Sequence, residues 1–219
     1  VRIIDLFDDE LLRERVEEIV YLKNNIYEGK MHIDVDETVN YLLDKFDQLL
    51  KLGVTFTSAS EIEEEIKNKK VLFEGAQGIM LDLDSGTYPY VTSSTTTAYS
   101  ASAADVTLTD DDTIMGVVKA YTSRVGEGEF PTELFDEEAD KLRKLGNEFG
   151  ATTGRNRRVG WIDLAQLRYA IKKSKINSIV MTKADVLNGY DKVKVCVGYE
   201  IDGVEQKMPF ISNDFKKAK

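Results

Sequence analysis

Three arginines, Arg155, Arg157 and Arg158, stand within four residues of a chain whose formal net charge is −10. The surrounding run, 149–158, also holds two glycines and a pair of threonines. Guanidinium groups form paired hydrogen bonds with carboxylates and phosphates, and glycine lets the backbone approach a ligand closely. A basic loop that is merely solvated is the alternative, but it would need neither the glycines nor the threonines. We therefore interpret this run as an anion-binding loop.

A second run, Thr182-Lys183-Ala184-Asp185, directly follows the apolar segment 176–181, which is typical of a buried parallel strand. The carboxylate of Asp185 could accept hydrogen bonds from both the N1–H and the 2-amino group of guanine, while the stem of Lys183 covers the ring. Adenine lacks this donor pair, so such a site selects GTP. An ordinary surface turn is the alternative. Because ligands of α/β proteins gather at the carboxyl ends of strands, the position favours the guanine interpretation.

A third run combines an amide flanked by glycines with a cluster of hydroxyls. Gln77 follows the short apolar segment 71–73, and the turn-rich segment 84–91 leads to three hydroxyl residues that begin at Thr92. An amide both donates and accepts hydrogen bonds, as contact with a purine or a sugar requires, and hydroxyls can donate to a phosphate. Alternatively, the hydroxyls cap a helix or satisfy a turn.

The elements that must position these residues begin with a helical subregion, 1–70. Apolar residues recur at helical spacing in two stripes, 11–22 and 39–50, which we expect to be structural. We expect Gly29 and Gly53 to end these helices. The expected N-terminal caps are Asp34 for the second helix and a Ser60–Glu63 capping box for a third.

From residue 71 onward, strands alternate with helices, which predicts an α/β fold with a mainly parallel sheet flanked by helices. This portion, 71–219, would bind the nucleotide and the substrates. We expect a tight hairpin turn at Asp202-Gly203. The expected strands are 71–73, 114–121, 176–181 and 193–200, and the expected helices are 136–145 and 162–174.

Composition excludes several classes of protein. No apolar stretch approaches the ~20 residues that a membrane span needs, and we expect no signal peptide. The acidic total argues against nucleic-acid binding, which depends on clustered Lys and Arg. The single cysteine, Cys196, lies in an alternating strand pattern, so we expect a packing role and no disulfide within the chain. We therefore expect a cytoplasmic globular protein.

Together, these runs resemble the adenylosuccinate synthetase family, whose members join IMP and L-aspartate at the expense of GTP. The resemblance covers nearly all of this chain, and the chain covers about the middle half of the family's usual length. The matching stretches, which lie in the family's order and spacing, are 73–78, 86–94, 119–134, 146–161, 181–187 and 193–200.

The resemblance implies a set of substrate contacts. Gln77 and Thr92 would contact IMP, with Thr92 near its phosphate, and Val125 and Arg155 would contact its ribose and the neighbouring aspartate. Arg157 would reach the GTP phosphates. The mobile loop that closes over L-aspartate would be Ala151, Thr152, Thr153, Gly154, Arg155, Asn156 and Arg157. The guanine reader would be Lys183, Ala184 and Asp185.

The implied reaction has two steps. GTP phosphorylates the 6-oxygen of IMP, and the amine of aspartate then displaces phosphate. Mg²⁺ and preorganised cations stabilise the phosphoryl charge in the first step. The resemblance also implies a homodimer, because family members share an arginine across the subunit interface, and that arginine would align just before Val1.

Parts of the family pattern are missing from the sequence. The family's Gly-Asp-Glu-Gly-Lys-Gly phosphate loop, which carries the catalytic Asp and part of the Mg²⁺ site, does not occur, and His32 does not match the family's catalytic His. We therefore assign no catalytic residue and no metal ligand. We expect the Mg²⁺ ligands upstream of Val1, a further guanine-binding segment beyond Lys219, and no ligase activity from these residues alone.

One stretch departs from the family. After Thr97 the family continues with a glycine-rich run, whereas 98–105 has no glycine and 110–112 are three aspartates. Ser85 stands where the family commonly has His. These differences indicate a divergent member, a viral or phage relative that accepts a 2-aminopurine nucleotide, or damage to the locus. Two other classes remain open: a GTP-binding module without ligase chemistry, which Thr182–Asp185 favours and the missing phosphate loop opposes, and a catalytically inert fragment.

Overall fold

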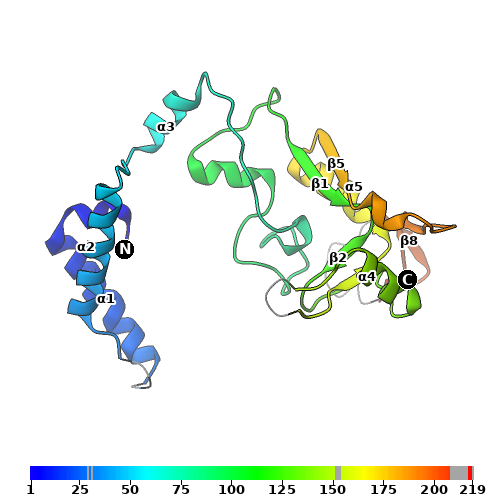
Figure 1. The fold of residues 1–219 in the computed structure, drawn as a ribbon, viewed down its shortest axis with the longest axis horizontal. Helices are drawn as coiled ribbons and strands as arrows, with labels where there is room; N and C mark the ends of the chain where they lie inside the picture. Colours follow the sequence, from blue (N-terminus) through cyan, green and yellow to red (C-terminus); the bar gives the residue numbers. More distant parts are fainter. Residues whose placement is uncertain (29, 31, 151–153, 208–216, 219) are drawn as a thin grey trace. The chain divides into compact units, whose positions relative to one another are not determined.

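The computed structural model describes the chain except for residues 29, 31, 151–153, 208–216 and 219 (Figure 1). The chain divides into two compact units, Val1–Ile62 and Glu63–Lys219. No helix among the described residues is long and apolar enough to cross a bilayer.

The first unit is built on two long helices, α1 (Asp9–Ile26) and α2 (Val35–Lys51), which follow the short helix η1 (Ile3–Phe7). Each begins at an aspartate that caps it. Asp34 accepts a hydrogen bond from the amide of Glu37 at 2.8 Å, which confirms the predicted cap. Gly53, just beyond α2, has a φ of +78° and ends the helix as predicted. Gly29 lies outside the described residues.

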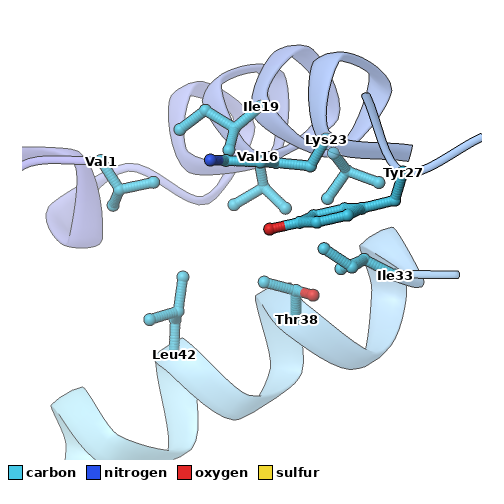
Figure 2. Close-up of a pocket in the computed structure, with 9 residues that line it drawn as sticks. Val1, Val16, Ile19, Lys23, Tyr27, Ile33, Thr38 and Leu42 are labelled. Carbon is cyan, nitrogen blue, oxygen red and sulfur yellow. The ribbon is translucent and has the colours of Figure 1, made fainter. Parts of the chain in front are cut away.

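The apolar stripes of α1 and α2 meet along one side only. Leu12, Val16, Val20 and Val39 are buried together, whereas Ile19 and the outer part of each stripe are exposed. The two helices also border an apolar hollow of about 340 Å³ (Figure 2). The residues that line it include Val16, Ile19 and Tyr27 on the α1 side and Thr38 and Leu42 on α2.

The third helix, α3 (Ala59–Ile66), begins with a capping box whose register differs from the prediction. The amide of Glu61 donates to Ser58 Oγ at 3.3 Å, and the amide of Ser58 donates to the Glu61 carboxylate at 2.9 Å. The Ser60–Glu63 box is therefore wrong by two residues. Both pairs satisfy the Ser-x-x-Glu pattern, and the Thr57 hydroxyl, which also donates to Glu61 at 2.7 Å, reinforces the earlier register.

The second unit contains parallel strand pairs with helices beside them, which confirms the α/β fold class. Strand β1 (Met115–Lys119) pairs in parallel with β5 (Ser178–Thr182), and in Figure 1 they lie side by side. β4 (Ile162–Asp163) pairs in parallel with β6 (Val195–Cys196). Helices α4 (Glu137–Leu145) and α5 (Leu164–Ser174) lie close to their predicted positions.

Antiparallel pairs complete the strands of this unit. β2 (Thr122–Arg124) pairs with β3 (Arg158–Gly160). The predicted strand 114–121 corresponds to β1, which ends at Lys119, and β2 begins just beyond the predicted range. β7 (Tyr199–Ile201) and β8 (Val204–Gln206) form the hairpin predicted at Asp202-Gly203. The remaining short helices are η2 (Ile79–Leu81), η3 (Ala98–Ala104) and η4 (Ala184–Leu187).

Three strand predictions require correction. The predicted strand 193–200 is two short strands, β6 and β7, which pair with different partners. Residues 71–73 form no strand, and Leu72 is 88% exposed, because no described strand pairs with them. β5 is parallel as predicted but not buried: Ile179, Val180 and Met181 are exposed, since β1 is its described partner on one side only. An apolar strand is buried only when neighbouring strands and helices cover it.

Candidate functional site

The residues proposed to meet the nucleotide converge on the segment that follows α4. Glu148 in this segment is 1% exposed. Its Oε1 accepts hydrogen bonds from Lys119 Nζ at 2.7 Å and from the Tyr121 hydroxyl. Its Oε2 accepts from Arg157 Nη1 at 3.3 Å. A buried carboxylate is thus shared between one neutral donor and two cations.

The charge of Glu148 follows from this environment. Burial by itself raises the pKa of Glu148, but the hydrogen bonds from Lys119 and Tyr121 and the charges of Lys119 and Arg157 outweigh it, so the pKa lies below its usual value. Burial and the neighbouring carboxylate raise the pKa of the Tyr121 hydroxyl, which therefore stays protonated and donates. The cluster holds one anion between two fixed cations.

Lys183 contacts the same segment. It follows β5 with a φ of +59°, and its Nζ donates to the carbonyl of Gly146 at 2.9 Å. Ala184 and Asp185 begin η4, and Asp185 is exposed, so its carboxylate is available to solvent or a ligand. The predicted guanine reader therefore stands at the carboxyl end of a parallel strand, as the sequence indicated.

The two ends of the predicted anion-binding loop are joined by backbone contacts. Phe149 and Asn156 form an antiparallel bridge, and the amide of Gly150 donates to the carbonyl of Arg155 at 2.8 Å. Gly154, with a φ of +63°, donates to the carbonyl of Gly150 at 2.8 Å. Arg155 and Asn156 are exposed. The predicted contacts Ala151, Thr152 and Thr153 lie outside the described residues.

Two predicted IMP contacts lie together on a different loop. Gln77 has a φ of +67°, and its Nε2 donates to Thr92 Oγ1 at 3.2 Å. The amide of Thr92 donates to the carbonyl of Leu81 at 2.7 Å. The amide and the hydroxyl that the sequence singled out, fifteen residues apart, thus form one polar pair.

A buried aspartate holds this loop in place. Asp82 is 2% exposed and accepts hydrogen bonds from the amides of Asp84 at 3.1 Å, Ser85 at 2.8 Å and Thr96 at 2.7 Å. Burial raises the pKa of Asp82, but these amide donors outweigh it and lower the pKa. The amides of one loop therefore stabilise the charged form of Asp82, and the carboxylate fixes the backbone path from Asp82 to Thr96.

Val125 is 68% exposed and directly follows Arg124, which links the two loops. Arg124 Nη2 donates to Thr87 Oγ1 and to the carbonyl of Tyr90, both at 3.2 Å. In the β2–β3 ladder Arg124 lies opposite Arg158, and the Arg158 guanidinium is paired with Glu133 through two hydrogen bonds. Burial and the charge of Arg158 lower the pKa of Arg124.

Sequence reasoning missed three residues that organise these loops, namely Asp82, Arg124 and Glu148. All three lie inside or beside the quoted motifs. Arg124 and Glu148 have partners at distant positions, which no spacing in the sequence indicates: Lys119 and Glu148 are 29 residues apart, and Arg124 and Thr87 are 37 apart. The partners of Asp82 are nearer in sequence, but they are backbone amides, which carry no signal in residue type. Among the described residues, no group of three or more His, Cys, Asp or Glu could hold a metal ion.

The divergent stretch after Thr97 has a regular structure. Residues Ala98–Ala104 form η3, and the carboxylate of Asp112 accepts from both the amide and the hydroxyl of Thr109, at 2.7 and 3.0 Å. The carbonyl of Ser85 accepts a hydrogen bond from the Tyr169 hydroxyl at 2.8 Å. Neither departure from the family pattern disrupts the Gln77–Thr92 pair.

Comparisons with known proteins agree on one family. A family model described as adenylosuccinate synthetase matches residues 1–219. The chain is 99% identical over 219 residues to the adenylosuccinate synthetase of Finegoldia magna and 50% identical to that of Petrotoga mobilis, and in each case it covers 52% of the relative. The chain thus spans about half the length of these relatives.

A solved structure gives the same result for the fold. The fully ligated adenylosuccinate synthetase from Plasmodium falciparum is 31% identical in sequence and aligns with a TM-score of 0.87. The alignment covers 100% of this chain and 53% of that one.

Proposed function

This chain belongs to the adenylosuccinate synthetase family, and we propose that the complete protein joins IMP and L-aspartate to form adenylosuccinate at the expense of GTP. The observation that supports this most directly is the convergence of Arg157 and Lys183 on the segment 146–148. One supplies a cation for phosphate and the other a stem for guanine. A nucleotide placed between them would have its base beside Lys183 and its phosphates beside Arg157, and both side chains are held by the same segment.

The proposed roles follow from the described contacts. The Gln77–Thr92 pair would orient IMP, with Thr92 near the phosphate, while the exposed Arg155 would meet the carboxylates of L-aspartate. Arg157 would stabilise charge on the GTP phosphates as the 6-oxygen of IMP is phosphorylated. The amine of aspartate would then displace phosphate. Bidentate arginines suit three anionic substrates, because each guanidinium matches two oxygens at once.

We also propose Mg²⁺ as the cofactor of the complete protein. The described residues do not fit a metal site, since they contain no cluster of three or more carboxylate, imidazole or thiol ligands. The metal ligands are therefore expected outside these residues, and no step above depends on them. The homodimer and the cytoplasmic location stay predictions.

No observation favours a 2-aminopurine substrate or an inert module over this reaction. The departures at Ser85 and 98–112 leave the Gln77–Thr92 pair formed, and the named relatives that span the whole chain are adenylosuccinate synthetases.

The test is the base preference of Asp185→Asn in the complete protein. Xanthine keeps N1–H but carries a 2-keto oxygen, which repels a carboxylate and accepts from an amide. The variant should lose GTP use and gain use of xanthosine triphosphate, because a site that hydrogen-bonds a group of its substrate discriminates strongly against an analogue that lacks this group. The measurement is kcat/KM for both nucleotides, with adenylosuccinate as the product.

The exposed Asp191, in the loop that follows η4, supplies the matched control. Asp191→Asn removes the same charge and should leave the preference for GTP unchanged. Equal losses for both nucleotides in Asp185→Asn, without any crossover, would show that Thr182–Asp185 is an ordinary turn. A wild-type protein that forms no adenylosuccinate from the three substrates would reject the proposed reaction itself.

A further inference from the structure

The proposed substrate contacts leave one buried acid of this region without a role. Glu148 contributes no atom to the surface that the substrates would reach, since it is 1% exposed. Burying a charge is costly unless it is paired and hydrogen-bonded. A hydrophobic residue of similar size would fill the same space without this cost. The presence of an anion at this position therefore calls for a function beyond packing.

The two oxygens of Glu148 have different partners. Oε1 accepts from Lys119 and from Tyr121, and both donors are held by other contacts: Lys119 Nζ also donates to Ser123 Oγ at 2.7 Å, and Tyr121 is 2% exposed. These contacts hold Oε1 in place. The second oxygen, Oε2, is thereby directed toward Arg157 Nη1.

Arg157 is held by Glu148 at two points. Besides the ion pair, the amide of Arg157 donates to the carbonyl of Glu148 at 3.0 Å. The side chain of Arg157 is 34% exposed, so part of it remains accessible. A guanidinium carries five N–H donors, and pairing through Nη1 leaves others for a ligand. Nε is buried and has no hydrogen-bond partner within the described part of the chain.

We propose that Glu148 is a positioning residue of the nucleotide site, which holds Arg157 in the orientation that meets the GTP phosphates. The inference rests on the proposed function, because it takes Arg157 and Lys183 as the GTP contacts. Gly146, two residues before Glu148, accepts from Lys183 at 2.9 Å. Displacement of this segment would therefore disturb both ends of the nucleotide together.

This role makes a specific kinetic prediction. Asp82 and Arg124 hold the loop proposed for IMP through separate contacts. A change at Glu148 should therefore act on GTP and leave IMP unaffected. A residue that only stabilised the fold would alter the use of all substrates in parallel, or would lower stability without altering any of them.

The experiment compares Glu148→Gln with wild type in the complete protein. Glutamine has nearly the same shape but no charge. We expect the KM for GTP to rise about ten- to hundredfold, the range expected from losing a hydrogen bond to a charged group, with the KM for IMP changed less than about threefold. Equilibrium titration with GTP should show the same loss of affinity, and this readout does not require turnover.

Asp163→Asn is the matched control. Asp163 is also a buried acid, 4% exposed, and it accepts from the hydroxyl of Tyr199 and from Gln166. Within the part of the chain that the structure describes, no guanidinium donates a hydrogen bond to it. It should lower the melting temperature without raising the KM for GTP. If both variants lower stability and neither changes GTP use selectively, Glu148 is structural and the proposal is wrong.

A double-mutant cycle shows whether Glu148 acts through Arg157. Arg157→Leu and the double variant with Glu148→Gln should weaken GTP binding equally. Once the guanidinium of Arg157 is absent, Glu148 has no cation to orient, so its replacement should cause no further loss. Additive losses would overturn the proposal. If Glu148→Gln fails to fold, Glu148→Asp keeps the charge but shortens its reach. It should then raise the KM for GTP less than Arg157→Leu does, and an unchanged KM would count against the proposal.

Different results would overturn the proposed reaction and the positioning role of Glu148. If the wild-type protein binds GTP but forms no adenylosuccinate, the proposed reaction is wrong, while the titrations still test Glu148. If it forms adenylosuccinate and Glu148→Gln binds GTP normally, the proposed reaction is supported and the positioning role of Glu148 is wrong.

Discussion

The two loops of the second unit that we propose to bind substrates each contain one buried carboxylate, but the two carboxylates are stabilised by different kinds of partner. Asp82, 2% exposed, is bound by backbone amides of its own loop. Glu148, 1% exposed, is bound by side chains from other elements, namely Lys119, Tyr121 and Arg157. Amide donors determine the path of a backbone, whereas side-chain donors are themselves oriented by the acid.

This difference suggests two kinds of preorganisation. The Asp82 loop would present a rigid surface to IMP, because its backbone cannot move without breaking several hydrogen bonds at once. The Glu148 segment would present charged side chains that are oriented by their contact with the acid. A site that must stabilise charge on phosphates during a transfer benefits from cations that are already oriented before the reaction.

The largest expected effect follows from removing the charge of Asp82. In Asp82→Asn an amide group would face the N–H of Thr96, so one buried donor loses its acceptor. We expect the free energy of unfolding of the complete protein to fall by about 3 kcal/mol, and the KM for IMP to rise as the loop loosens. Denaturant unfolding and steady-state kinetics measure the two effects.

Asp84, which is exposed on the same loop, serves as the control. Asp84→Asn should change the unfolding free energy by less than about 0.5 kcal/mol, as is usual for surface substitutions. An equal effect at both positions would show that the amide contacts of Asp82 do not contribute to the unfolding free energy beyond what an exposed aspartate does.

Two glycines probe how closely each loop is packed. A Cβ at Gly86 would lie 2.5 Å from the carbonyl oxygen of Asp82 and 2.6 Å from that of Met80, both in the backbone. A Cβ at Gly146 would press on the hydroxyl of Tyr121, a side chain, and lie 2.9 Å from the carbonyl oxygen of Leu142. We expect Gly86→Ala to cost about 3 kcal/mol and Gly146→Ala about 1–2 kcal/mol, because overpacking costs most where neighbours cannot move.

Thermal unfolding of both variants checks this order. Gly75→Ala is the control, since nothing lies within 4 Å of its added Cβ. If Gly146→Ala destabilised the protein more than Gly86→Ala, the Asp82 loop would be the more adaptable of the two. The order of packing tightness proposed here would then be reversed.

The local features of this fold could be predicted from the sequence because their causes are local. The cap at Asp34, the end of α2 at Gly53 and the hairpin at Asp202-Gly203 each depend on residues within a few positions of one another. The capping box of α3 shows the limit of this reasoning. Two overlapping Ser-x-x-Glu pairs fit the same rule, and a neighbouring hydroxyl decides between them.

Features that depend on distant partners could not be predicted in the same way. Residues 71–73 have the composition of a strand, but a strand forms only where another strand accepts its hydrogen bonds. The motif residues Gln77, Arg157 and Lys183 could be selected by type and spacing. Their supports could not, because Glu148 finds its partners 29, 27 and 9 residues away in sequence. Spacing alone does not reveal such pairs.

A smaller effect should appear in the dependence of stability on pH. The pKa values of Glu148 and Asp82 are both lowered in the folded protein, from ordinary values of 4.5 and 3.8. A carboxylate of this kind contributes its full stability above the unfolded pKa and loses it as the pH falls through the folded pKa. Stability should therefore decline as the pH falls below about 4.5.

Glu148→Gln and Asp82→Asn should each remove the part of the acid-induced loss of stability that is due to the carboxylate they replace. Unfolding free energies measured at a series of pH values should show a shallower acid slope in Glu148→Gln from about pH 4.5 downward, and in Asp82→Asn from about pH 3.8 downward. Slopes identical to wild type in either variant would mean that folding does not lower the pKa of the carboxylate concerned.

The smallest effect concerns the contact between Tyr121 and Gly146. Tyr121→Phe removes one donor to Glu148 but leaves both cations, so we expect a loss of about 1 kcal/mol in unfolding free energy and no change in GTP use. It also removes the oxygen against which a Cβ at Gly146 would press. The combined variant with Gly146→Ala should therefore be less destabilised than the sum of the single changes, by about 0.5–1 kcal/mol. Strict additivity in thermal or denaturant unfolding would show that the clash at Gly146 comes from the Leu142 carbonyl, and the Glu148 segment would then be as tightly confined by backbone as the Asp82 loop.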